Sequence, residues 1–192
     1  MRADRNSPWQ ALFRLAAGQE GLFSARQAEY ANCSQQLLAK YLGAGRIERV
    51  QRAVYRVVDF PPGEHEGLVA VWLWSRNEGV FSHETALFLH NLSDALPIRA
   101  HVSLPTSWKT RVLQIPEGIA IHHADVSGPD LSWVGPVPAT SVRRTISDCL
   151  HGAVAPELIA QATAQAAERG LLSKAEILSV PGVSLLQLRS GS

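Results

Sequence analysis

The chain has 192 residues, 46% hydrophobic and 18% charged, with a formal net charge of +1; this composition is typical of a globular protein and excludes a disordered chain. No apolar run reaches the roughly eighteen residues needed to cross a bilayer, and the N-terminal stretch lacks the apolar core of a secretory signal, so neither a membrane span nor export is expected. Cys33 and Cys149 lie far apart in sequence and give no metal-site spacing, which indicates reduced thiols and a cytoplasmic location.

Charge is distributed unevenly along the chain. Residues 1–60 contain nine Arg or Lys against five Asp or Glu, a net +4, whereas residues 61–192 contain nine basic and twelve acidic residues, a net −3. The two parts meet at DFPPGEHEG, where proline and glycine are typical of a boundary between structural units. We predict two domains, 1–60 and 61–192, of which the basic first one binds a polyanion.

Capping residues and apolar spacing predict three helices in the first domain, at residues 8–18 and 24–32 and from residue 34 to 43 or 45. The second helix opens with a capping box made by Ser24 and Gln27. Two strands are predicted next, with the turn of their hairpin at Gln51 and Arg52. This order of elements is that of a winged helix-turn-helix.

The third predicted helix has a polar face that suits DNA recognition. At about 100° per residue, Gln35, Gln36, Ala39, Lys40 and Gly43 gather on one arc, and the leucines and the tyrosine fall on the opposite side. Glutamine pairs with adenine in the major groove, and lysine reaches guanine or phosphate. The helix therefore has one face for packing and one for bases.

The hairpin GRIERVQRAVYRV carries Arg46, Arg49, Arg52 and Arg56, which are predicted to hold phosphates or to probe the minor groove. Strand alternation prevents all four from facing DNA equally. Any one of these side chains is also what an ordinary solvated surface carries. Taken together, and in this order after the third helix, they favour DNA binding.

The motif SHETALFLH is the first dense stretch of the second domain. His83 and His90 share a helical face, with Glu84 in the first turn, but their spacing is not that of the HExxH zinc motif, and two histidines leave a metal site short of ligands. His122 and His123 lie on opposite faces of a strand, so they cannot both turn to one metal. We predict no metal and no cofactor, and interpret these histidines as packing residues.

The motif TSVRRTISDCLH is the second dense stretch. Arg144 and Asp148 are four residues apart on a predicted helix and can form an ion pair. The pair either positions a nucleotide phosphate or a partner, or stabilises the helix, and we prefer the structural interpretation. No P-loop, GxSxG or strand-linked GxGxxG motif occurs, so the sequence indicates no enzyme class.

The fold class predicted for the whole chain is α+β: a winged helix-turn-helix followed by a mixed α/β domain with a small sheet and packed helices. Apolar periodicity and turn residues predict the elements of this second domain. Its helices are expected at 64–76, 82–90, 140–151, 155–169 and 173–180, and its strands at 98–105, 111–115 and 118–124.

The stretch GLFSARQAEYANCSQQLLAKYLGAGRIERVQRAVYRV resembles the N-terminal winged helix of AbiEi-type proteins, the antitoxin and repressor components of abortive-infection type IV toxin–antitoxin systems. The later SHETAL stretch with His90, and Arg144-Thr145 with Asp148, resemble two further motifs of that family. The chain departs from the family pattern at Ala53, where the wing turn usually has glycine, and at Asn91, where glycine often follows the histidine.

The resemblance implies a DNA-binding repressor that binds inverted repeats in its own promoter and counters a nucleotidyltransferase-type toxin, directly or indirectly. The DNA contacts are then expected from the polar face of the third helix and the arginines of the hairpin. His83, Glu84, His90, Arg144 and Asp148 are candidates for a motif of the antitoxin domain.

Three alternatives stay open at this level. A solitary transcriptional regulator without a toxin has the same sequence features. A protein-interaction module would use the winged helix to bind protein instead of DNA. An enzyme that depends on a metal or a nucleotide, built around His83 and His90, would need its histidines and an acidic residue to converge within ligand distance.

Overall fold

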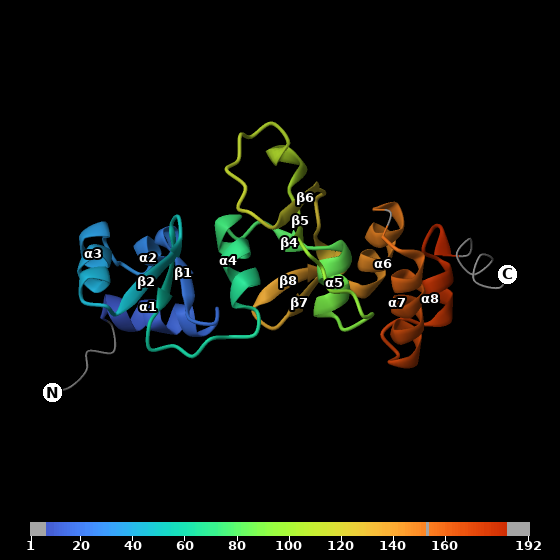
Figure 1. The fold of residues 1–192 in the computed structure, drawn as a ribbon, viewed down its shortest axis with the longest axis horizontal. Helices are drawn as coiled ribbons and strands as arrows, with labels where there is room; N and C mark the ends of the chain where they lie inside the picture. Colours follow the sequence, from blue (N-terminus) through green and yellow to red (C-terminus); the bar gives the residue numbers. More distant parts are fainter. Residues whose placement is uncertain (1–6, 153, 184–192) are drawn as a thin grey trace. The chain divides into compact units, whose positions relative to one another are not determined.

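A computed structural model describes residues 7–152 and 154–183 of the chain (Figure 1). The fold is α+β, as the sequence predicts, and it divides into two compact units, Met1–Asn77 and Glu78–Ser192. Among the described residues, no helix is long and apolar enough to cross a membrane.

The first unit has the element and strand order of a winged helix-turn-helix. Its sheet has the order β1-β3-β2, with both pairs antiparallel. In chain order the elements are α1 (Pro8–Ala17), β1 (Leu22–Ser24), α2 (Ala25–Tyr30), α3 (Gln35–Gly43), β2 (Ile47–Gln51), β3 (Val54–Val57) and α4 (Glu66–Trp74).

Serine caps fix where the first three helices begin. The Ser7 hydroxyl accepts a hydrogen bond from the Gln10 amide at the start of α1, and Ser34 accepts one from Leu37 at the start of α3. Ser24 and Gln27 form the predicted capping box of α2. Such caps satisfy amides that have no partner within the helix, which is why a local sequence signal located these starts.

The hairpin between β2 and β3 turns one residue later than predicted, at Arg52 and Ala53. Ala53 has a φ of 61°, in the left-handed region that favours glycine. The ladder is irregular between Arg49 and Gln51 because Val50 bulges out of register. Strand β1, which was not predicted, pairs with β3 through Leu22–Ser24 and is too short to show an alternating pattern.

The division between the units falls after Asn77, whereas the sequence placed the domain boundary at residue 60. The first unit includes α4 because that helix packs on β1 and β3, and the Gln51 side chain donates a hydrogen bond to the Ala70 carbonyl at 2.8 Å. The Pro-Gly segment is also held within this unit, since the Glu20 carboxylate accepts a hydrogen bond from the His65 amide at 2.9 Å.

The second unit contains a mixed sheet with strand order β6-β5-β4-β8-β7. The pairs β5–β6 and β4–β8 are parallel, and β4–β5 and β7–β8 are antiparallel. The elements are β4 (Val80–Phe81), α5 (His83–Leu89), β5 (Ala100–Leu104), η1 (Thr106–Trp108), β6 (Ile119–His123), η2 (Gly128–Asp130), β7 (Leu131–Val134), β8 (Val137–Thr140), α6 (Val142–His151), α7 (Pro156–Glu168) and α8 (Lys174–Leu178).

The predicted helices of the second unit are present, but one predicted strand is wrong. Residues 111–115 form no strand, and Val112 is fully exposed. Three strands, β4, β7 and β8, were not predicted, since each is four residues or shorter. Apolar residues of α5, α6, α7 and α8 form one core, with Leu87, Ile146 and Ala162 completely buried.

Candidate functional site

The polar face of α3 is exposed as its spacing predicted. Gln35, Gln36 and Lys40 are all exposed, whereas Leu38 and Tyr41 are buried in the core of the first unit. The B-DNA major groove is wide enough to admit a helix. The exposed face of α3 therefore offers two amides and one ammonium group to a ligand of that shape.

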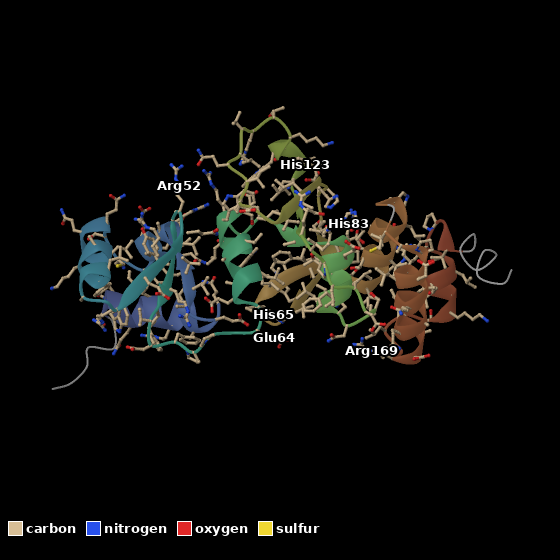
Figure 2. The ribbon with its side chains drawn as sticks, viewed as in Figure 1. Arg52, Glu64, His65, His83, His123 and Arg169 are labelled. Carbon is tan, nitrogen blue, oxygen red and sulfur yellow. The ribbon has the colours of Figure 1, made fainter. Side chains whose placement is uncertain are left out.

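The hairpin arginines occupy three different environments. The Arg46 guanidinium lies over the Trp9 ring, 3.6 Å from its centroid, and Arg49 lies 5.6 Å from the Tyr55 centroid with a long hydrogen bond to its hydroxyl. Figure 2 shows Arg52 at the tip of the β2–β3 hairpin, where it is exposed. These three residues are exposed, so their charges lie at the surface of the first unit.

Arg56 differs from the other three because two acidic side chains of the first unit pair with it. Its side chain is only 15% exposed and forms ion pairs with Glu48 at 3.2 Å and Glu66 at 3.3 Å. It also donates a hydrogen bond to the Phe60 carbonyl at 2.9 Å. Two acidic partners neutralise this guanidinium, so its geometry indicates a role in stability, and its predicted contact with phosphate stays a prediction.

Sequence reasoning missed two exposed residues on α2. Tyr30 is 73% exposed, and the Arg26 guanidinium lies 5.7 Å from the centroid of its ring. The first helix of a helix-turn-helix crosses the DNA backbone, which places such side chains next to phosphates. Their spacing of four on a short helix is the signal that could have found them.

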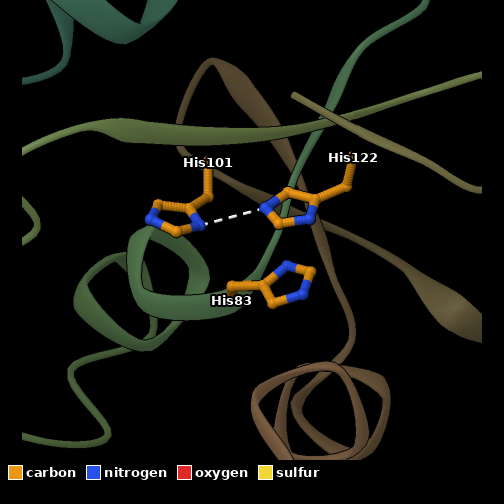
Figure 3. A group of neighbouring side chains, drawn as sticks. All are labelled: His83, His101 and His122. Atoms are coloured by element: carbon orange, nitrogen blue, oxygen red, sulfur yellow. Dashed lines mark hydrogen bonds between the residues drawn. The ribbon is translucent and has the colours of Figure 1, made fainter. Parts of the chain in front are cut away.

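In the second unit, three histidines from three different elements come together (Figure 3). His83 begins α5, His101 lies on β5 and His122 lies on β6. The rings of His83 and His122 are stacked with centroids 3.7 Å apart, and His101 Nδ1 lies 3.0 Å from His122 Nε2. Of these three histidines, the sequence identified His83 as a site candidate, whereas His122 was interpreted as a packing residue.

The pKa values of these histidines are all lowered, chiefly because the rings are removed from water. Burial lowers the pKa of His83 to about 3, with His122, His101 and Arg144 adding to the shift. Burial also lowers the pKa of His122, and it lowers that of His101 although Glu84 opposes the shift. The cluster is therefore neutral at pH 7, and each ring keeps a lone pair.

The remaining candidates of the second unit lie in two places. His90 is separate from the cluster, since its Nε2 donates a hydrogen bond to the Thr140 carbonyl at 2.8 Å. Arg144 donates to Asp148 at 2.7 Å and to Asp130 at 3.0 Å. Arg144 and Asp148 therefore form the ion pair that their spacing allows, and Arg144 lies close enough to His83 to affect its pKa.

A pocket of about 580 Å³ opens beside the cluster. His83 and His122 form one part of its wall, and the helix α6 supplies Arg143, Arg144 and Asp148. Burial raises the pKa of the Asp148 carboxyl, against the effect of Arg144. The second unit therefore has a polar pocket whose wall contains histidines, arginines and the two aspartates that pair with Arg144.

A comparison with known protein families finds a match within the first unit. Residues 10–58 match the family described as "Transcriptional regulator, AbiEi antitoxin", so the resemblance to AbiEi proteins is confirmed over this segment. No curated protein sequence matches the chain. Among solved structures, the crystal structure of RV2827C protein from Mycobacterium tuberculosis is similar at 12% identity and a TM-score of 0.43, covering 81% of this chain and 69% of that one.

Proposed function

We propose that this protein is a transcriptional repressor that binds DNA through its winged helix and also acts as the antitoxin of a type IV toxin–antitoxin system. The observation that carries the proposal is the exposed face of α3, next to a hairpin with surface arginines, within the segment that matches AbiEi transcriptional regulators. The basic charge of the N-terminal part supports the same assignment.

Each side chain then has a defined task on the duplex. Gln35 and Gln36 read base edges in the major groove, where glutamine pairs with adenine, and Lys40 contacts guanine or phosphate. Arg49 and Arg52 hold backbone phosphates, which positions the protein without reading sequence.

Arg46 contributes a further phosphate contact from the start of the wing. Stacking on Trp9 restricts its guanidinium, so less side-chain entropy is lost when the contact forms. Arg56 is expected to contribute least to phosphate binding because Glu48 and Glu66 already pair with it.

The proposed operator is an inverted repeat in the protein's own promoter, which the repressor occupies to limit its own synthesis. A reporter gene placed behind that promoter tests this directly. We expect repression by the full chain, loss of repression in the double variant Lys40→Ala with Arg52→Ala, and full repression by Lys174→Ala, a matched surface lysine on α8. Equal reporter output with and without the protein would contradict autoregulation.

The antitoxin role is assigned to the second unit and has its own test. A nucleotidyltransferase-type toxin encoded beside this protein is co-expressed with the full chain, and growth is measured. We expect the Lys40→Ala, Arg52→Ala variant to rescue growth while failing to repress the promoter. Repression without rescue by the unaltered chain would instead identify a solitary regulator.

A further inference from the structure

We propose that His83, His101 and His122 bind one divalent transition-metal ion of the zinc type at the edge of the pocket in the second unit. Imidazole nitrogen is a preferred ligand of Zn²⁺, Co²⁺, Ni²⁺ and Cu²⁺, and three protein ligands with an open fourth position are typical of reactive zinc sites. The proposal concerns the second unit only and does not depend on DNA binding.

The sheet brings these residues to one place. In the parallel pair β5–β6, His101 is opposite Ala120 and Ser103 is opposite His122. Because side chains alternate along a strand, His101 and His122 project from the same face of the sheet. The turn after β4 adds His83 to this face, where the Ser82 amide donates a hydrogen bond to the His101 carbonyl at 3.1 Å.

The distances between the ring nitrogens suit a shared ion. One nitrogen of each histidine lies within 4.8 Å of those of the other two, and two of them are only 3.0 Å apart. Zinc–nitrogen bonds of about 2.0–2.1 Å in a tetrahedron place neighbouring nitrogens roughly 3.3 Å apart. Binding therefore requires the more distant nitrogens to approach one another and the stacked rings of His83 and His122, whose planes are 16° apart, to turn toward one ion.

Neighbouring polar groups orient two of the rings. Glu84 Oε2 lies 3.4 Å from His101 Nε2, which favours the proton on that nitrogen and leaves the Nδ1 lone pair toward His122. His83 Nδ1 lies 3.0 Å from the Ser82 hydroxyl, which Ser103 in turn contacts at 2.9 Å. A carboxylate behind a ligating histidine is a common feature of zinc sites, where it fixes the tautomer.

His83 is held in an unusual backbone conformation. Its φ is 52°, although it is 8% exposed and begins a helix. A Cβ atom added to Gly152 would lie 2.5 Å from His83 Cδ2, so the glycine leaves the room that this ring occupies. Backbone strain of this kind persists where the surroundings fix a side chain in position, and it is enriched at functional sites.

The open coordination position of the ion would face the pocket. His83 and His122 line the pocket, together with Arg143 and Arg144 of α6. Arg144 is paired with Asp130 and Asp148, so Arg143 is the cation of this wall that favours an anionic ligand, such as a carboxylate or a phosphate. The site therefore has the arrangement of a centre that binds an exchangeable anion, with the protein supplying three nitrogens.

Metal binding is measured on the untagged full-length chain. Co²⁺ is added while its visible absorption is recorded, and Zn²⁺ is then titrated to displace it. We expect one ion per chain, a tetrahedral Co²⁺ spectrum, and at least tenfold weaker binding in both His101→Ala and His122→Ala. His123→Ala is the matched control, because this neighbour of His122 projects from the opposite face of β6, and its affinity should not change.

A second readout needs no variant. In the ¹H–¹⁵N spectrum of the histidine rings, Zn²⁺ should shift the resonances of the three cluster histidines and leave that of His90 in place. Absence of Zn²⁺ binding at micromolar concentration, or equal binding by His122→Ala and His123→Ala, would overturn the metal site. Either result leaves the DNA-binding proposal unaffected, since that proposal rests on the first unit.

Discussion

Arg46 lies over the indole ring of Trp9, with 3.6 Å between its guanidinium carbon and the ring centroid. The contact joins α1 to the start of β2, and the same guanidinium lies 5.2 Å from the Tyr41 ring of α3. One side chain thus couples the position of the wing to that of the proposed recognition helix.

Replacing Arg46 with lysine keeps the charge but removes the planar group that stacks. We expect the free energy of unfolding to fall by about 0.5–1 kcal/mol, the magnitude of a cation–π contact near the surface. Urea unfolding of Arg46→Lys measures this, with Arg52→Lys at the hairpin tip as the control. A loss in the control equal to that in Arg46→Lys would contradict a specific role for the Trp9 contact.

Substitution of Arg56 should mainly reduce stability, whereas substitution of Arg52 should mainly reduce DNA affinity. Arg56→Ala leaves Glu48 and Glu66 without their shared cation and should lower the free energy of unfolding by about 1–3 kcal/mol. Arg52→Ala should reduce stability less and weaken DNA binding more. Thermal unfolding measures the stability of the two variants, and titration with a DNA duplex measures their affinity. A larger loss of DNA affinity in Arg56→Ala than in Arg52→Ala, at a temperature where Arg56→Ala remains folded, would contradict these roles.

Glycine at position 53 should stabilise the wing. Ala53 has a φ of 61°, and a residue with a Cβ atom is unfavourable in this region by about 1 kcal/mol relative to glycine. We expect Ala53→Gly to raise the free energy of unfolding by up to that amount. The matched control is Ala39→Gly on α3, where glycine should instead lower the free energy of unfolding by about 0.5–1 kcal/mol. A loss of stability in Ala53→Gly would show that the turn at Ala53 is not strained.

His90 should make the protein less stable in mild acid. Burial lowers its pKa in the folded state, the hydrogen bond to Thr140 opposes that shift, and Arg169 adds to it. The unfolded chain, with a histidine pKa of about 6.5, therefore binds more protons as the pH falls below that value, so the free energy of unfolding decreases. His90→Gln should show a smaller decrease between pH 7.5 and 5.5 in urea unfolding, and an equal decrease would exclude this origin.

The sequence located those features whose causes are local. Serine caps and the spacing of Leu38 and Tyr41 predicted α3 and its exposed face, because a helix start and an apolar stripe are set by residues a few positions apart. The two departures from the AbiEi pattern, Ala53 and Asn91, both have positive φ, which explains in physical terms why glycine suits these positions.

The features that were missed depend on pairing between distant segments. His101 and His122 meet only because β5 and β6 are parallel in one particular register, which their own sequences do not specify. Side-chain alternation along β6 separates His122 from His123, but it does not identify the partner of His122 on β5. In the same way, one of the two acidic partners of Arg56 is Glu66, which α4 contributes.

The central claim is that α3 reads bases while the wing holds phosphates, and one titration tests it most directly. A labelled duplex of the protein's own upstream DNA and a scrambled duplex are titrated at several salt concentrations with the wild type, with Gln35→Ala plus Gln36→Ala, and with Arg52→Ala. We predict that the glutamine variant loses preference for the upstream duplex, whereas Arg52→Ala weakens binding to both duplexes and reduces the salt slope by about one. Equal affinity of the wild type for the two duplexes at every salt concentration would contradict the claim.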